Sequence, residues 1–134
     1  MIEQMLAEAR SRIRRYSPAE AARAADALIV DLRSDDERRG LGIVPGSVHV
    51  PRSVLEWRCD QGSGFANPHL ARHRLILLCA HGYSSSLAAA SLVDLGLEDA
   101  SDVEGGFEAW CEALLPVSAA PAPRAGRPGM GGPA

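Results

Sequence analysis

The sequence predicts an α/β domain in which a central parallel sheet carries helices on both faces. Short apolar runs that suit buried strands alternate along the chain with segments whose apolar residues recur at helical spacing. The run 75–78 (Leu-Ile-Leu-Leu) lies between polar residues, as expected of a strand buried on both faces. Such alternation is typical of parallel sheets, because parallel neighbours need a long crossover connection, usually a helix.

Length and composition bound the class of protein. A chain of 134 residues with 46% hydrophobic content is long enough for one domain with its own core. Because the net charge is −3, we expect neither nucleic acid nor an anionic membrane as a partner. All 14 basic residues are arginine, which excludes chemistry based on lysine. The three cysteines are widely spaced, so we expect no disulfide scaffold and no structural metal. Nothing in the sequence implies an organic cofactor.

The amino-terminal residues do not have the pattern of an export signal. Residues 1–15 are acidic and polar at the start and lack a basic region followed by an apolar one. Further along, no apolar run approaches the ~20 residues that cross a bilayer. Together with the cysteine pattern, this predicts a cytoplasmic protein with reduced thiols.

The amino-terminal half is predicted to begin with two helices. Apolar residues at helical spacing indicate an amphipathic helix over residues 1–11, laid on the domain. Ser17 and Glu20 have the spacing of a capping box, so a helix is expected over 18–25. The elements that follow are a strand at 28–32, a charged loop or short helix at 33–40, and a strand at 47–50.

The carboxyl-terminal half is predicted to end in a segment that does not pack. The elements expected here are a brief helix at 53–58, a surface loop at 59–68, a strand at 75–78, a helix at 87–95, a strand at 101–103 and a helix at 107–115. Residues 118–134 consist largely of Ala, Pro and Gly, and we expect them to be disordered. The domain itself is expected to span 12–117.

Cys79 directly follows the strand 75–78 and precedes a helix. At the carboxyl edge of a parallel sheet, the N–H groups of the loop and of the first helical turn converge on anions. They favour the thiolate and lower the pKa of a cysteine from about 8.5. A buried core cysteine is the alternative interpretation. The position after the strand, with Gly82 allowing the backbone to turn inward, favours a nucleophile.

Four motifs occur in a fixed order along residues 12–115. They are Asp31-Leu32-Arg33, Val44-Pro45-Gly46-Ser47 with Val50-Pro51, the loop from Cys79 to Ser85, and Glu104-Gly105-Gly106-Phe107-Glu108-Ala109-Trp110. In these motifs the chain resembles the rhodanese family, and in particular its small single-domain bacterial thiosulfate sulfurtransferases. The resemblance implies a rhodanese-like α/β fold with Cys79 as the catalytic residue, which accepts sulfane sulfur as a persulfide. It also implies that the backbone of the loop binds substrate, at Ala80, His81, Gly82, Tyr83, Ser84 and Ser85.

The role of several further residues stays open at this stage. His81 either stabilises the thiolate or points to solvent. The loop lacks the arginine or lysine that many relatives use to pair with thiosulfate, so Arg52 and Arg58 are candidates for that role. The resemblance implies that Asp31 and Arg33 brace the scaffold. The residues expected in structural roles are Gly105 and Gly106 in a tight turn, Phe107 and Trp110 in the core, and Cys59 and Cys111 as thiols without a catalytic part.

The predicted activity is sulfur transfer in two half-reactions. The Cys79 thiolate attacks the outer sulfur of thiosulfate or of a persulfide, and the new Cys79 persulfide passes its sulfur to a thiol or cyanide. The alternative is a non-catalytic rhodanese-like binding or sulfur-relay module. A phosphatase is disfavoured, because the related Cys-x₅-Arg loop has Ser85 in place of the arginine that grips a phosphoryl group.

Overall fold

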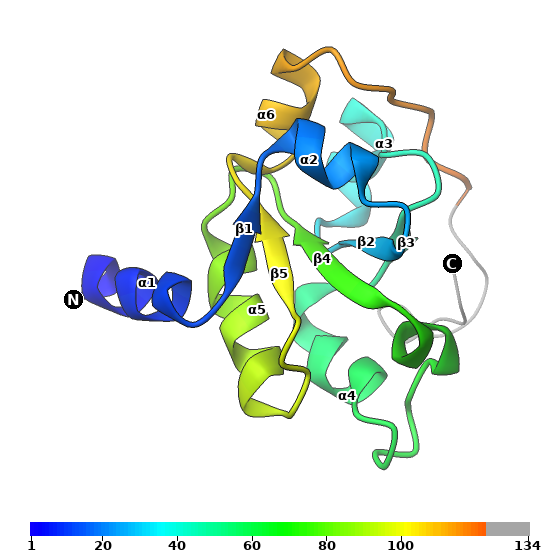
Figure 1. The fold of residues 1–134 in the computed structure, drawn as a ribbon. Helices are drawn as coiled ribbons and strands as arrows, with labels where there is room; N and C mark the ends of the chain where they lie inside the picture. The colour runs from blue at the N-terminus through cyan, green and yellow to red at the C-terminus, as the bar shows by residue number, and fades with distance from the viewer. Residues whose placement is uncertain (123–134) are drawn as a thin grey trace.

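The sheet of this computed structural model, which describes residues 1–122, is entirely parallel and has five strands (Figure 1). Its order is β1-β5-β4-β2-β3, with β4 at the centre. The strands are β1 (Arg14–Tyr16), β2 (Ala27–Asp31), β3 (Val48–His49), β4 (Arg74–Leu78) and β5 (Ser101–Val103). The predicted α/β class with a central parallel sheet is therefore confirmed.

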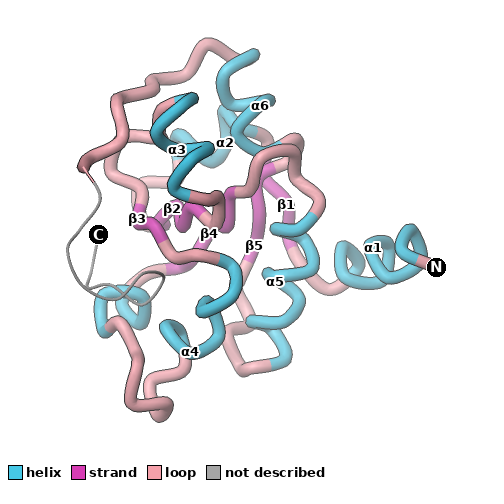
Figure 2. The backbone as a smooth tube through the Cα atoms, turned by 180° about the vertical axis from the view of Figure 1, so that it is seen from behind, coloured by secondary structure: helices cyan, strands magenta, loops and turns pink. Residues whose placement is uncertain are grey.

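Helices cover both faces of the sheet (Figures 1 and 2). They are α1 (Ile2–Ser11), α2 (Pro18–Arg23), α3 (Asp35–Leu41), α4 (Leu55–Cys59), α5 (Ser84–Asp94) and α6 (Gly106–Glu112), with short 3₁₀ turns η1 (Arg52–Val54) and η2 (Pro68–Arg72). The helices α4 and α5 lie on one face, and α2 and α6 lie on the other. No helix within residues 1–122 has the length and apolarity needed to cross a membrane.

The two layers of the core meet at β4. Its side chains alternate between the faces, because successive residues of a strand point in opposite directions. Leu75 and Leu77 pack in the cluster beneath α4 and α5, whereas Ile76 and Leu78 pack in the cluster beneath α2 and α6. All four are buried. The uninterrupted apolar run in the sequence is thus explained by burial on both sides.

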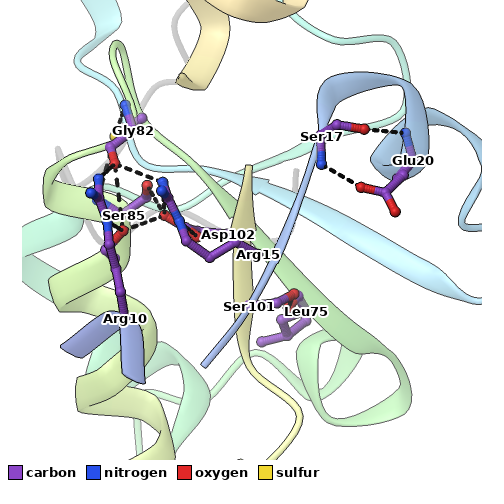
Figure 3. Close-up of polar contacts among 11 residues, drawn as sticks. Arg10, Arg15, Ser17, Glu20, Leu75, Gly82, Ser85, Ser101 and Asp102 are labelled. Carbon is purple, nitrogen blue, oxygen red and sulfur yellow. Dashed lines mark hydrogen bonds and ion pairs between the residues drawn. The ribbon is translucent and has the colours of Figure 1, made fainter. Parts of the chain in front are cut away.

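Two capping boxes start the first helices of the domain. The Ser17 hydroxyl accepts a hydrogen bond from the Glu20 N–H, and the Glu20 carboxylate accepts one from the Ser17 N–H (Figure 3). Ser34 and Glu37 form the same reciprocal pair. The charged segment 33–40, predicted as a loop or a short helix, accordingly contains the helix α3.

The strand β1 was not predicted from the sequence. It consists of three residues, two of them arginines, and its backbone pairs with β5 at the edge of the sheet. A segment this short shows no alternation of apolar and polar residues that would reveal it. The helix α1 precedes it and packs against α5, with Ala9 as its buried residue.

The predicted carboxyl-terminal tail begins at residue 118. Ser118 exchanges two backbone hydrogen bonds with Ile43, N to O distances of 2.8 and 2.9 Å. Just before it, the indole N–H of Trp110 donates to the carbonyl oxygen of Pro116 at 2.9 Å. These contacts extend the ordered chain beyond α6. Residues 123–134 of the predicted tail lie outside the described residues.

Candidate active site

Cys79 lies at the carboxyl end of β4, at the start of the loop that leads into α5. The first turn of α6 packs against this loop through its backbone. The N–H of Phe107 donates to the carbonyl oxygen of Cys79 at 2.8 Å, and the N–H of Glu108 donates to that of Ala80 at 3.1 Å. Because the first N–H groups of a helix have no partner within the helix, they are free to hold the loop in this way.

Glycines allow the loop and α6 to approach so closely. A Cβ atom on Gly82 would lie 2.6 Å from the Gly105 nitrogen, and one on Gly106 would lie 2.4 Å from the Cys79 carbonyl oxygen. Gly82 and Gly105 also have positive φ angles of 83° and 73°. The predicted tight turn at Gly105 and Gly106 beside the loop is confirmed. Side chains at these positions would push the loop out of place.

The sulfur of Cys79 accepts hydrogen bonds from its own loop. The N–H of Gly82 donates at 3.1 Å and the N–H of Ser85 at 3.4 Å. The residue is 6% exposed, so little water competes for the sulfur. The loop backbone therefore surrounds the cysteine with the positive ends of peptide dipoles.

This environment favours the thiolate of Cys79. Burial raises the pKa of the thiol, but hydrogen bonds from Ser85, Ser84 and the Gly82 N–H outweigh it, so the pKa lies below its ordinary value. Cys59 shows what burial does without such donors: desolvation, with a smaller contribution from Glu56, raises its pKa to about 12. Of these two buried thiols, Cys79 is the one prepared to act as a nucleophile.

A buried carboxylate anchors the loop from behind (Figure 3). Asp102 on β5 is fully buried, and its Oδ2 accepts hydrogen bonds from the hydroxyls of Ser85 at 2.8 Å and Ser86 at 2.7 Å. Its charge is balanced by Arg15 on β1, whose Nε lies 2.9 Å from Asp102 Oδ1. Burying an unpaired charge costs much free energy. We therefore expect the loss of any of these partners to destabilise the fold around Asp102.

Two arginines also meet at the carbonyl oxygen of Gly82. Arg10 Nη2 donates to this oxygen at 2.8 Å and Arg15 Nη2 at 3.0 Å. Arg10 in addition donates through Nε to the Ser86 hydroxyl at 3.1 Å, and its guanidinium lies over the Tyr83 ring, 5.8 Å from the centroid. The loop is thus held from α1 and β1 as well as from α6.

The remaining predicted loop residues lie at the surface. His81 is exposed, and its Nδ1 lies 2.5 Å from Glu108 Oε2 on α6. Tyr83 is 62% exposed. Ser84 is the first residue of α5. The sequence left open whether His81 stabilises the thiolate or points to solvent. In the structure its ring is exposed and is oriented by the Glu108 carboxylate.

The two arginines proposed to bind the donor have other partners. Within residues 1–122, Arg52 donates to the Glu56 carboxylate, and Arg58 donates to the carbonyl oxygen of Phe65. In the described structure these contacts tie each side chain to its own region of the chain, and the role of the two arginines in binding the donor stays a prediction.

The pair Asp31 and Arg33 braces the scaffold, as the sequence predicts. Both residues are buried, and Arg33 Nη2 lies 2.9 Å from Asp31 Oδ2. The same guanidinium donates to the Gly42 carbonyl oxygen and stacks on the ring of Phe107. Phe107 and Trp110 are both 3% exposed and lie in the core, as predicted.

Sequence reasoning missed Arg10, Arg15, Asp102 and Glu108. An acidic residue inside a buried strand was a usable signal at Asp102, because such a carboxylate requires partners. The partners themselves come from positions 15, 85 and 86, and nothing local in the sequence connects them. For Arg10 and Arg15 no signal was available, because the chain contains many surface arginines.

Fold and site together define an α/β domain in which a buried cysteine with a lowered pKa lies in a backbone cradle at the end of a central strand. A family model described as the rhodanese-like domain matches residues 17–113. The chain therefore belongs to the rhodanese-like domain family, as its motifs indicated.

Curated relatives cover most of the chain. The thiosulfate sulfurtransferase GlpE of Vibrio cholerae is 48% identical over 91 residues, which are 68% of this chain and 78% of the relative. The thiosulfate sulfurtransferase GlpE of Stutzerimonas stutzeri is 38% identical over 92 residues, which are 69% of this chain and 77% of the relative. Among solved structures, a protein of unknown function from Rhodopseudomonas palustris, described as a possible tyrosine phosphatase, is 36% identical with a TM-score of 0.83, covering 88% of this chain and 94% of that one.

Proposed function

We propose that this protein is a rhodanese-type sulfurtransferase that carries sulfane sulfur on Cys79. The observation that carries the proposal is the environment of the buried Cys79. Its sulfur accepts hydrogen bonds from two N–H groups of its own loop, and the pKa of its thiol is lowered. The relatives named thiosulfate sulfurtransferase support the same class of activity. A thiolate at neutral pH is the property that such a reaction needs.

The first half-reaction loads the cysteine. The Cys79 thiolate attacks the outer sulfur of thiosulfate, a new S–S bond forms, and the bond to the inner sulfur breaks, so that sulfite leaves with the electron pair. No proton transfer is required. The N–H groups of Gly82 and Ser85 already face the Cys79 sulfur and are placed to stabilise negative charge that moves on to the added sulfur.

The second half-reaction unloads it. A thiophilic acceptor, cyanide or a thiolate, attacks the outer sulfur of the Cys79 persulfide, and Cys79 leaves as a thiolate. A low pKa of Cys79 favours this step as well, since a thiol of lower pKa is the better leaving group. The same cradle therefore assists both halves of the cycle.

The donor that we infer is thiosulfate or a persulfide. The loop side chains from Ala80 to Ser85 include no arginine or lysine, so we expect the anion to be bound mainly by backbone N–H groups. We infer that small anionic sulfur donors bind here and that thiols or cyanide accept the sulfur.

The competing functions are a binding module and a phosphatase. A binding module has no need of a buried thiol with a lowered pKa. A phosphatase of the Cys-x₅-Arg type needs a guanidinium where this chain has Ser85, whose hydroxyl instead donates to Asp102. The phosphatase hypothesis is tested because the similar Rhodopseudomonas palustris protein is described as a possible tyrosine phosphatase.

Mass spectrometry after incubation with thiosulfate tests the proposal. We expect an adduct of about 32 Da, one sulfur atom, at Cys79 in the wild type, and its removal by cyanide with formation of thiocyanate. Cys79→Ser is the matched control and should show neither. No adduct across thiosulfate and persulfide donors would favour the binding module. Turnover of an aryl phosphate by the wild type and not by Cys79→Ser would favour the phosphatase.

A further inference from the structure

The carbonyl oxygen of Gly82 is the point at which the amino-terminal segment meets the active loop. It accepts hydrogen bonds from Arg10 at 2.8 Å and Arg15 at 3.0 Å, and the Ser86 hydroxyl lies 3.4 Å away (Figure 3). Charge-assisted bonds of this kind are about twice as strong as neutral ones. The two guanidiniums match the two lone pairs of the carbonyl oxygen, so this peptide group is held by two charged donors from outside the loop.

Gly82 also contacts the sulfur of Cys79 directly. Its N–H donates to Sγ at 3.1 Å, while its carbonyl oxygen is held by the two arginines. The residue has a φ of 83°, so its two peptide groups have an orientation that few other residues adopt. The two peptide groups meet at the Gly82 Cα, so arginines that hold the carbonyl oxygen restrain the N–H through the φ and ψ angles of this residue.

We propose that Arg10 and Arg15 are positioning residues of the active loop, which fix Gly82 so that its N–H stays on the Cys79 sulfur. This inference rests on the proposed function for its catalytic meaning, but the geometry that it explains is independent of any substrate. By this proposal α1 and β1, which lie at the edge of the molecule, each supply one side chain that positions the active loop.

Both arginines come from the segment before the region 17–113 that the family model matches. Arg10 comes from α1, whose single buried residue is Ala9, so this helix contributes little to the core. Arg10 nevertheless reaches three parts of the active loop and α5: the Gly82 carbonyl oxygen, the Ser86 hydroxyl and the Tyr83 ring. The polar contacts of α1 are concentrated where the chemistry takes place.

The charges around the loop support the same conclusion. Arg15 is shared between Gly82 and the buried Asp102, so its charge is largely balanced there. Arg10 has no carboxylate partner among the ion pairs of residues 1–122. Among the described residues, Arg10 therefore contacts the loop and α5 rather than a carboxylate.

The chain offers a matched control on the same segment. Arg12 follows directly after α1 and pairs with Asp94 of α5, away from Gly82. Replacing Arg12 by glutamine removes the same charge from the same part of the chain without touching the loop. Arg10→Lys retains the charge but cannot reproduce the fork that reaches Ser86 and Gly82 together.

The experiment measures the rate at which iodoacetamide labels Cys79 as a function of pH, in the full chain, for Arg10→Gln, Arg15→Gln, Arg10→Lys and Arg12→Gln. We expect Arg10→Gln and Arg15→Gln to raise the pKa of Cys79 by about one, which lowers labelling roughly tenfold at mildly acidic pH. Arg10→Lys should recover only part of the rate, and Arg12→Gln should behave as the wild type.

The outcomes separate this inference from the proposed function. If folded Arg10→Gln has the same labelling profile as Arg12→Gln, Arg10 is not a positioning residue, whether or not Cys79 transfers sulfur. If Arg15→Gln fails to fold because Asp102 loses its partner, Arg10→Gln, which leaves the Arg15–Asp102 pair in place, decides alone. Failure of the proposed function shows instead as absence of a Cys79 persulfide in the wild type, and it leaves the labelling measurement intact.

Discussion

The hydroxyl of Ser85 donates a hydrogen bond of 2.8 Å to the buried carboxylate of Asp102, while the backbone N–H of the same serine donates to the Cys79 sulfur at 3.4 Å. One residue thus connects the anchor of the loop with its reactive atom. The hydroxyl has a single proton, which serves one acceptor at a time. Through Ser85, the position of Asp102 sets the geometry of the N–H groups around the sulfur.

Asp102→Ala removes this anchor. The substitution leaves two serine hydroxyls and Arg15 without their shared acceptor, and we expect it to lower the free energy of unfolding by about 3 kcal/mol. Sulfur transfer should fall as well, because Ser85 loses its fixed position. Urea denaturation and steady-state kinetics measure the two effects. Asp99→Ala is the control at an exposed aspartate nearby, and equal stability of the two variants would contradict the anchoring role.

Gly82→Ala tests the close approach between the loop and α6. The added Cβ would lie 2.6 Å from the Gly105 nitrogen, so the loop must move and carry its N–H away from the sulfur. We expect kcat to fall on the order of 100-fold, as for other misplaced catalytic groups. Gly46→Ala is the control, because Gly46 has a similar φ of 80° and open space around it. It should cost about 1 kcal/mol of stability from backbone strain and leave kcat unchanged.

Should both glycine variants retain the kcat of the wild type, the loop tolerates displacement and the N–H cradle is not what drives the reaction. Loss of kcat in both variants alike would mean that strain in the fold, and not contact with Gly105, limits activity.

The central part of the fold was predictable because its signals are local. The run 75–78, the cysteine after it and the Ala-rich helix that follows identify β4, the loop and α5 without further information. The capping box at Ser17 and Glu20 was equally local. The strand β1 was not predictable, because its residues Arg14–Tyr16 join the sheet through backbone pairing with β5, which their side chains do not reveal.

In the candidate site, too, the local features were predictable and the contacts between distant segments were not. The loop that contains Cys79 was predicted, since the cysteine and the N–H groups around its sulfur lie within seven consecutive residues. The groups that hold this loop come from far along the chain: Arg10 from α1, Arg15 from β1 and Asp102 from β5. Such contacts are decided by the order of the strands, in which β1 lies beside β5 and β5 beside β4. No spacing in the sequence shows that order.

Cys59 gives a prediction for alkaline pH. Its pKa is about 12 in the folded protein, chiefly because of burial, against an ordinary value of about 8.5 when unfolded. Between these values the unfolded chain loses a proton that the folded protein keeps, so unfolding becomes more favourable as pH rises. The contribution of Cys59 is fully present below about pH 8.5 and declines above it by about 1.4 kcal/mol for each pH unit.

Urea denaturation of the wild type and of Cys59→Ala between about pH 8 and 11 measures this slope. The variant is less stable at every pH because of the cavity it creates, and only the difference in slope is informative. Identical slopes would show that Cys59 ionises as readily in the folded protein as in the unfolded chain.

The pKa of Cys79 leads to the most direct test of the nucleophile. At mildly acidic pH, limiting iodoacetamide should label Cys79 before Cys59 and Cys111, because only the thiolate reacts and Cys79 has N–H donors and a lowered pKa. Cys59 is buried with a raised pKa, so it should react last. Cys111 is exposed on α6 and serves as the accessible control within the same molecule.

Thiosulfate or sulfite added beforehand should slow the labelling of the Cys79 thiol and leave that of Cys111 unchanged. Either anion can occupy the N–H donors of the loop, and thiosulfate in addition converts the thiol into a persulfide with release of sulfite. Cys79→Ser should retain the fold and lose sulfur transfer altogether, since a hydroxyl of far higher pKa cannot carry a persulfide. Mass spectrometry of the labelled peptides identifies the site. Faster labelling of Cys111, or sulfur transfer by Cys79→Ser, would mean that the nucleophile is wrongly assigned and would make the non-catalytic module the better hypothesis.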